Sequence, residues 1–391
     1  DIRESGVTTV PDALRLVPGL QVARIDANKW AISSRGFNGV FANKLLVLID
    51  GRSVYTPLFS GVFWDSQNIP LHDIDRIEII RGPGATLWGA NAVNGIINII
   101  TRDARETSDK YISLGTGTEN KFIGHVRYGK SLTDNLHFRI HARYYNHDGF
   151  VDSNNVEQKD GWDVFRSGFR LDWDYSQNTS IMVQGEAYRE NIGQLCRIIR
   201  SFKDTDFTNI DTTAQVTGAN LLFRWEHIFS YSSDMALQLY YDLYDRSDVI
   251  LCGQFHIGDL DFQHRFQIGN RNETIWGLGY RFMYDNSRGT TYFYLEPDSR
   301  QTDIMSAFVQ DELTLIEDRM TLTMGTKFEH NYYTGLEILP NIRFLFKPYP
   351  LNTIWCAISK AVRTPSRVEN DAHAIRNVWN FAGLPLFGQM Q

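Results

Sequence analysis

The sequence predicts a small α+β domain of about 100 residues followed by a transmembrane antiparallel β-barrel. Three observations support this fold class. Residues 1–103 mix short segments of different kinds, whereas from Lys110 onward long stretches alternate apolar and polar residues. These stretches run for about 10 to 14 residues, which is long for soluble strands and suits tilted membrane strands. Short and long polar connections alternate between them, as at the two ends of outer-membrane barrels.

The N-terminal region carries the signals of a compact domain. Thr9 and Pro11, followed by an apolar stretch to Leu16, predict a short capped helix, because proline is accepted in a first helical turn. Residues 45–49 predict a buried strand that ends in a turn at residues 50–52. We therefore expect a separate domain over residues 1–103 and the N-terminal part of a barrel over residues 104–391.

Residues 76–102 place a glycine-rich stretch between two β-branched runs. A dinucleotide-binding loop needs a third glycine where Leu87 stands, and a Walker loop needs a lysine that is missing here. The segment therefore predicts a strand, a turn and a second strand, in which glycine permits positive φ and close backbone approach. The glycines concerned are Gly82, Gly84, Gly89 and Gly95.

Residues 136–144 illustrate the alternation in the second region. Leu136, Phe138, Ile140, Ala142 and Tyr144 share one face, and His137, Arg139, His141 and Arg143 share the other. Period-two alternation of this kind gives a strand one apolar and one polar face. About 13 such strands end near Ala361, and an open sheet edge is not tolerated in lipid, so further strands are expected after Gln391.

Composition and motifs exclude several classes of function. A net charge of −7 gives no basic footprint for nucleic acid. HExxH, CxxC and GxSxG patterns are missing, so no catalytic residue, cofactor or metal site is predicted and the protein is not expected to be an enzyme. His137 and His141 could bind a metal, but a hydrated barrel wall explains them better. The charged start at residues 1–4 indicates that any targeting segment has been removed.

Four motifs occur in a fixed order in the first 103 residues, namely residues 32–37 (ISSRGF), 47–52 (VLIDGR), 77–83 (IEIIRGP) and 89–99 (GANAVNGIINI). Together they resemble the plug domain of TonB-dependent outer-membrane receptors. Residues 308–313 and 359–365 resemble barrel strands of the same family.

The resemblance implies a barrel of about 22 strands closed by an N-terminal plug in the bacterial outer membrane. Receptors of this family import scarce nutrients such as ferric siderophores, haem or cobalamin. TonB and its inner-membrane energising complex supply the force that moves the plug. The resemblance thus implies three partners, namely TonB, a small-molecule metal chelate and the lipid membrane. The TonB-contacting segment would precede Asp1, and about nine strands would follow Gln391.

The resemblance also suggests a latch between plug and barrel. Arg35 and Arg81 would face barrel acids across a hydrated interface, where individual ion pairs are weak and therefore breakable. Glu312 and Glu329 lie on the polar faces of their strands and are the expected acids. The alternative is that both arginines are solvated turn residues.

Residues 55–64 are unusually aromatic for a loop, and exposed aromatic side chains mark binding sites more often than packing. We therefore predict that this loop binds the ligand, the alternative being that it belongs to the plug core. The ligand-binding candidates are Tyr55, Phe59, Phe63 and Trp64.

The strand count predicts a disulfide. If the first strand, near Tyr111, runs outward, Cys196 and Cys252 both fall in neighbouring external connections, after the fifth and seventh strands. The outer face is oxidising, so nearby thiols there tend to pair. Cys356 lies within a strand and is expected to stay free.

Import of a ferric siderophore is the predicted function, with haem, cobalamin or another metal chelate as alternative cargo. A passive porin is the alternative in the same membrane, although it would lack the domain that residues 1–103 supply. A soluble β-rich protein that binds or hydrolyses carbohydrate also alternates apolar and polar residues, but it would bury both strand faces.

Overall fold

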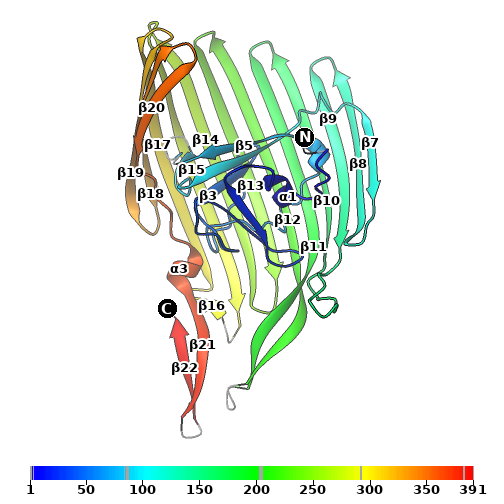
Figure 1. Cartoon of the computed structure of the whole chain (residues 1–391). Helices are drawn as coiled ribbons and strands as arrows, with labels where there is room; N and C mark the ends of the chain where they lie inside the picture. The colour runs from blue at the N-terminus through cyan, green and yellow to red at the C-terminus, as the bar shows by residue number, and fades with distance from the viewer. Residues whose placement is uncertain are drawn as a thin grey trace.

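The computed structural model describes residues 2, 4–82, 84, 88–201, 206–290, 293–381 and 384–390. Figure 1 shows two parts: a long, curved antiparallel sheet, and a small domain that lies against the concave side of that sheet. We call the sheet the wall.

Within its described residues, the N-terminal domain contains the short helix α1, a 3-10 turn and two small sheets. A hairpin of β1 (Leu20–Arg24) and β2 (Trp30–Ser34) follows α1 (Val10–Leu14). The second sheet has the order β4-β3-β6-β5, with β3 and β6 parallel and the other pairs antiparallel. Its elements are β3 (Leu45–Ile49), β4 (Arg52–Ser53), η1 (Leu71–Asp73), β5 (Ile74–Arg81) and β6 (Gly95–Thr101).

The predicted local structures are confirmed in this domain. Thr9 caps α1 by accepting a hydrogen bond from Asp12 N, and proline stands in the first turn. Every residue of β3 is buried, as its unbroken apolar sequence predicts. The glycine-rich stretch joins β5 and β6, which pair antiparallel.

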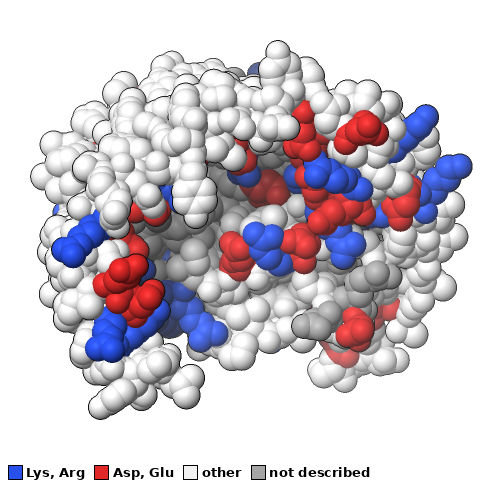
Figure 2. All heavy atoms as spheres, turned by 90° about the horizontal axis from the view of Figure 1, so that it is seen from above, with Lys and Arg blue, Asp and Glu red and all other residues white. Residues whose placement is uncertain are grey.

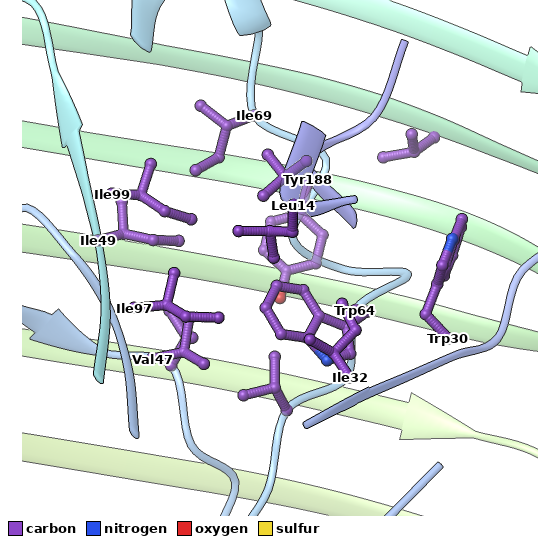
Figure 3. Close-up of a cluster of buried hydrophobic side chains, with 14 of the residues drawn as sticks. Leu14, Trp30, Ile32, Val47, Ile49, Trp64, Ile69, Ile97, Ile99 and Tyr188 are labelled. Atoms are coloured by element: carbon purple, nitrogen blue, oxygen red, sulfur yellow. The ribbon is translucent and has the colours of Figure 1, made fainter. Parts of the chain in front are cut away.

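The apolar core of the domain lies between its two sheets and continues onto the wall. In Figure 3, side chains from α1, β2, β3 and β6 converge on one cluster, and Tyr188 reaches it from the wall. Further wall residues extend the same cluster, namely Tyr145, Trp162, Val164, Ile192, Ala214 and Val216. The domain is therefore folded around its own core and shares part of that core with the wall.

The wall consists of 13 antiparallel strands, each paired with its neighbour in sequence except where β16 intervenes. The last strand ends at Ser359, so the prediction of about 13 strands ending near Ala361 is confirmed. The first strands are β7 (Lys110–Gly115), β8 (Asn120–Thr133), β9 (Leu136–His147), β10 (Trp162–Ser176), β11 (Thr179–Ser201) and β12 (Asp206–Ser230). The others are β13 (Ser233–Ser247), β14 (Leu251–Ile268), β15 (Asn272–Gly289), β17 (Ser299–Ile316), β18 (Met320–Asn331), β19 (Gly335–Tyr349) and β20 (Asn352–Ser359).

Connections differ between the two ends of the wall. Tight turns join β8 to β9, β10 to β11 and β12 to β13 at one end, which is the top in Figure 1. Longer connections, such as residues 148–161 and 290–298, lie at the other end. We call these ends the short-turn end and the long-loop end.

Alternation along each strand separates two faces, as predicted. On β9, Arg139 and Arg143 are buried beneath the N-terminal domain, whereas Ile140 and Tyr144 are exposed on the convex side. Exposed apolar side chains recur on the convex side of later strands, for example Met324 and Phe328 on β18. An apolar outer face and a polar inner face are what a membrane-embedded barrel wall requires.

The remaining elements lie beyond the last wall strand. β16 (Phe293–Leu295) pairs with β21 (Ala372–Phe381), which pairs with β22 (Leu384–Met390), and α3 (Arg367–Asp371) precedes them. Residues 359–365 were expected to form a barrel strand, but β20 ends at Ser359 and the chain then turns toward the N-terminal domain. No helix in the described part of the chain combines the length and the apolar character needed to span a bilayer.

Gly95 illustrates why the β5–β6 turn needs glycine. Its φ is +154°, and a Cβ atom there would lie 2.5 Å from the Ile80 carbonyl oxygen and 3.3 Å from Leu45 Cδ1. The backbone oxygen cannot move away without breaking the pairing of β5 with β6. Close approach of the two strands therefore depends on the missing side chain.

We predict that Gly95→Ala destabilises the N-terminal domain by at least about 1 to 2 kcal/mol, because alanine is strained at this φ and would also clash. Gly39→Ala is the control, since nothing lies within 4 Å of a Cβ atom at Gly39. Denaturant titration and protease resistance of the detergent-solubilised full-length protein measure both variants. Equal stability of the two variants would contradict the prediction.

Candidate functional site

The candidate site is the interface between the N-terminal domain and the concave face of the wall. Figure 2, which looks down from the top of Figure 1, shows Lys, Arg, Asp and Glu side chains gathered around the hollowed interior. These charges come from both parts of the chain, because the polar faces of the wall strands point toward the N-terminal domain. Their pairing determines how firmly the domain is held.

Near the short-turn end, Asp73 is the centre of a buried charge cluster. Arg127 of β8 donates to its carboxylate, and His125 Nε2 lies 3.5 Å from it. Burial alone would raise the pKa of the Asp73 carboxyl, but the hydrogen bond from His125 and the charges of Arg139 and Arg127 hold that pKa well below its usual range. Asp73 is thus a carboxylate that links η1 to two wall strands.

Arginines of the wall also bind main-chain carbonyls of the domain. Arg139 Nη1 donates to Arg102 O at 2.7 Å, and Arg143 donates to Ile69 O at 2.8 Å and to Thr8 O at 3.0 Å. Guanidinium groups with several donors suit this task, because one side chain satisfies carbonyls from separate segments.

A second cluster extends from Asp242, in the middle part of β13, to Arg246, near the long-loop end of that strand. Arg52 of β4 forms an ion pair with Asp242 of β13, and Arg246 Nη1 lies 3.4 Å from Asp65. Burial raises the pKa of the Asp65 carboxyl, and the charge of Arg246 opposes that rise. Next to Asp65, Ser66 donates to Glu190 at 2.9 Å.

Toward the long-loop end, the tip of the β1–β2 hairpin is covered by the wall. Ala27 N donates to Asp160 Oδ2 at 2.8 Å, and Asn28 Nδ2 donates to the carbonyls of Asp160 and Gly193. Trp30 meets Trp162 edge to face, with ring centroids 6.0 Å apart. The 148–161 connection therefore closes over this tip.

A polar cavity of about 470 Å³ separates β3 and β6 from wall strands β12 to β18. Charges of both signs line it, including Arg224, Arg281, Lys327, Asp259 and Glu329. In the described part of the chain, no group of three or more His, Cys, Asp or Glu side chains is arranged to hold a metal ion.

Comparison with known proteins identifies the arrangement. Residues 1–96 match the family model described as the TonB-dependent receptor plug domain. The iron-regulated outer membrane virulence protein of Vibrio cholerae is 25% identical over 384 residues, or 93% of this chain. Residues 1–96 therefore form a TonB-dependent receptor plug domain, and the whole chain has the fold of receptors of this family. The N-terminal domain is its plug, and receptors of this family are non-enzymatic transporters that reside in the bacterial outer membrane.

Other relatives agree on the fold. The vitamin B12 transporter BtuB of Vibrio vulnificus is 33% identical over 121 residues, which is 30% of this chain and 19% of the relative. The siderophore receptor PirA of Pseudomonas aeruginosa superposes with a TM-score of 0.69 at 17% identity, over 94% of this chain and 61% of PirA. A mutant of the ferric enterobactin receptor PfeA from the same organism, in complex with enterobactin, superposes with a TM-score of 0.71 at 16% identity. The match covers 94% of this chain and 62% of that receptor. The chain spans 56% of the length of the Vibrio cholerae relative.

The predicted latch is not formed by the predicted arginines. Arg81, at the exposed end of β5, donates to Pro18 O of the plug itself, and Arg35 lies beside Gly82. Among the residues that the structure describes, neither arginine makes an ion pair with a wall carboxylate. The reason is local: the loop before β1 presents a carbonyl directly beside Arg81.

Of the two predicted wall acids, Glu329 contacts the plug and Glu312 does not within the described chain. Glu329 Oε2 accepts a hydrogen bond from Ala90 N at 3.3 Å. Glu312 accepts from Thr323 of the adjacent strand. Both lie on the concave face, as predicted, but Glu312 is near the short-turn end and away from the 89–91 turn.

The aromatic loop is packed rather than exposed. Tyr55, Phe59 and Trp64 are each less than 9% exposed, and Tyr55 Oη donates to Leu45 O. Phe63 stacks on Tyr244 of the wall with centroids 5.2 Å apart. The ligand-binding prediction assumed exposed rings, and the structure instead uses them to seat the plug loop against β13 and β14.

All three cysteines are free, so the predicted disulfide between Cys196 and Cys252 is missing. Both lie toward the long-loop end, as the strand count requires. Cys196 was expected in a connection after the fifth strand, but it lies within a strand, since β11 continues to Ser201. β12 and β13 lie between the strands that carry the two thiols, which keeps the cysteines from pairing.

Asp73, Asp65 and Arg246 were not predicted as site residues. Alternation identifies wall residues that face inward, but it does not reveal which plug group each one meets. His137 is 5% exposed and the side chain of His141 is 6% exposed, so neither lines an open, hydrated barrel wall as the sequence suggested.

We predict that Asp73→Asn weakens plug attachment by about 3 to 5 kcal/mol, because it leaves buried Arg127 without its carboxylate partner at this position. Asp75→Asn is the control, since Asp75 and its partner Arg76 are both largely exposed and such pairs contribute at most about 1 kcal/mol. Denaturant titration of the full-length receptor in detergent measures both. An effect of Asp73→Asn no larger than that of the control would refute the role of Asp73.

Asp73 also predicts a pH dependence. Because its folded pKa is lowered, its contribution is fully present above the unfolded value of about 3.9 and is lost as pH falls below that value. The receptor should lose plug stability between about pH 4 and pH 2, and Asp73→Asn should show a smaller loss over the same range. Parallel slopes for the two proteins would contradict the assignment.

Proposed function

We propose that the complete protein imports a ferric siderophore across the outer membrane by TonB-dependent active transport. The observation that carries this proposal is how the plug is attached. Charged contacts, such as Asp73 with Arg127 and Arg52 with Asp242, fasten the half of the plug toward the short-turn end and its middle. Toward the long-loop end, apolar contacts such as Trp30 with Trp162 add to the hydrogen bonds and charges that fasten the plug there.

This gradient suits a plug that is pulled from one side. In outer-membrane barrels the short turns face the periplasm, where TonB acts. Water entering from that side can solvate Asp73 and Arg127 as they separate, whereas separated apolar surfaces gain nothing from water. The attachment nearest the pull is thus the part that water can replace.

The nature of the cargo rests on relatives. The Vibrio cholerae protein described as iron-regulated aligns with 93% of this chain, including the wall strands. The vitamin B12 transporter is more identical, but only over 30% of the chain. Since cargo meets the wall as well as the plug, similarity over both favours an iron chelate. Haem, cobalamin and other metal chelates remain the alternatives.

A passive porin is disfavoured by the filled interior. The plug buries wall arginines, including Arg143 and Arg166, under its own main chain. A pore that conducts passively needs an open, water-filled lumen.

The test is uptake by cells that express the full-length receptor, with and without functional TonB. We expect radiolabelled ferric enterobactin or another ferric siderophore to accumulate only when TonB works. Haem and cyanocobalamin serve as parallel probes. Uptake that persists without TonB would support a porin, and TonB-dependent uptake of cyanocobalamin alone would replace the proposed cargo.

A further inference from the structure

We propose that residues 360–371, here called the strap, hold two outer loops of the plug to the wall and must release them in each transport cycle. The inference rests on the proposed function, because it assigns the strap a role in plug movement. The two loops are residues 54–61, between β4 and η1, and residues 88–92, between β5 and β6.

The strap leaves the wall at the end of β20. Lys360 N still donates to Pro340 O of β19 at 3.0 Å, but the following residues are not paired with β19. In Figure 1 the orange-red chain runs from the end of β20 to α3. The chain thus passes from the wall to the plug.

Asn91 is the first attachment point. Its backbone N donates to Val362 O at 2.9 Å, and its Nδ2 donates to Thr364 Oγ1 at 3.0 Å. In return, Thr364 N donates to Asn91 Oδ1 at 3.1 Å. Asn91 has a φ of +70°, which asparagine tolerates better than most residues, and this conformation presents both its backbone and its amide to the strap.

The second attachment point is the loop that carries the buried aromatic residues. Arg367 N donates to Pro57 O at 3.1 Å, and Val368 N donates to Leu58 O at 2.9 Å. Val368 also packs against the cluster that contains Leu58 and Phe59. These two amides are the first of α3 and have no partner within a helix, so the plug loop satisfies them.

On its other side, the strap is fixed to the wall by charges. Arg367 is 1% exposed, and its guanidinium bonds to Asp285 of β15 at 3.0 Å and to Pro297 O at 2.6 Å. Asp371 pairs with Arg367 and lies 3.0 Å from Arg300 of β17. Within the strap, Arg363 pairs with Glu369 at 2.6 Å, which stiffens it.

The two sides of the strap therefore differ in chemistry. Its plug side uses neutral hydrogen bonds, each of which exchanges for water at small net cost, whereas its wall side uses buried charges that are costly to separate. When the plug moves, the strap should stay with the wall and let go of Asn91 and the 57–58 carbonyls. The strap also reaches Arg300 and Tyr333 near the long-loop end, so it joins the outer face to the plug.

The experiment is a reversible tether in the full-length receptor in living cells. Asn91→Cys and Thr364→Cys are combined in a background in which Cys196, Cys252 and Cys356 are replaced by serine. An oxidant applied after membrane insertion forms the cross-link, so folding is not at issue. We expect the tethered receptor to bind radiolabelled ferric enterobactin, or whichever probe is transported, but to lose TonB-dependent uptake until a reductant is added.

The control pair is Gln254→Cys with Asn286→Cys, which are register partners of β14 and β15 within the wall. Their cross-link should leave uptake unchanged. Full uptake by receptors tethered between 91 and 364 would overturn the proposal, and so would failure of these two cysteines to cross-link although both react with a thiol reagent. Failure of the proposed function gives a different result: the untethered receptor takes up no probe, and the cross-link yield alone then decides whether the strap contacts the plug.

Discussion

The convex face of the wall is largely apolar, so most buried polar side chains of its strands lie on the concave face, where burial makes a hydrogen-bond partner necessary. The plug supplies these partners largely through its main chain. Arg139, Arg143 and Arg166 bind the carbonyls of Arg102, Ile69 and Ser66. A carbonyl brings no opposite charge, so the attraction is weaker than in an ion pair and is lost without leaving a second buried charge behind. The wall is thereby satisfied while the plug remains separable from it.

Some plug carboxylates pair with charged side chains of the wall. Asp73 ends η1 and faces β8, and Asp65 faces Arg246 near the long-loop end of β13, so the connection between β4 and β5 carries both anchoring acids. The apolar contacts through Tyr145, Trp162 and Ile192 also lie toward the long-loop end. Water reaching the plug from the short-turn end would therefore meet the contact of Asp73 with β8 before the Asp65 contact and these apolar contacts.

Much of this architecture could be predicted from local patterns. Alternation in residues 136–144 correctly divided Arg139 and Arg143 from Ile140 and Tyr144, because the two faces of a strand follow directly from its period. The same reasoning gave the strand count, and the β-branched runs on both sides of a glycine-rich stretch gave the pairing of β5 with β6. The predictions that were wrong concerned which residue each side chain contacts. Arg81 donates to a plug carbonyl, and the aromatic rings of residues 55–64 pack against the wall. Both contacts join residues that are distant in sequence, and no local pattern predicts them.

The predictions about the cysteines and about residues 359–365 were wrong for a related reason. The positions of Cys196 and Cys252 along their strands were nearly right, yet pairing depends on their lateral separation, which the sheet order sets. Residues 359–365 resemble a barrel strand of the family, but the resemblance does not show where a strand leaves its neighbour. Thr364 turns inward because Asn91 offers it both a donor and an acceptor.

The turn between β5 and β6 contacts both the wall and the strap. Gly95 allows the two strands to approach, and Gly89 allows the turn to approach the wall, since a Cβ atom there would lie 3.0 Å from both Lys327 Nζ and Glu329 Oε2. Between them, Ala90 N reaches Glu329 and Asn91 reaches the strap. The glycines are therefore needed for more than the shape of the turn. By removing side chains at the points of closest approach, they let the backbone itself form the bonds to the wall and leave Asn91 as the side chain that meets the strap.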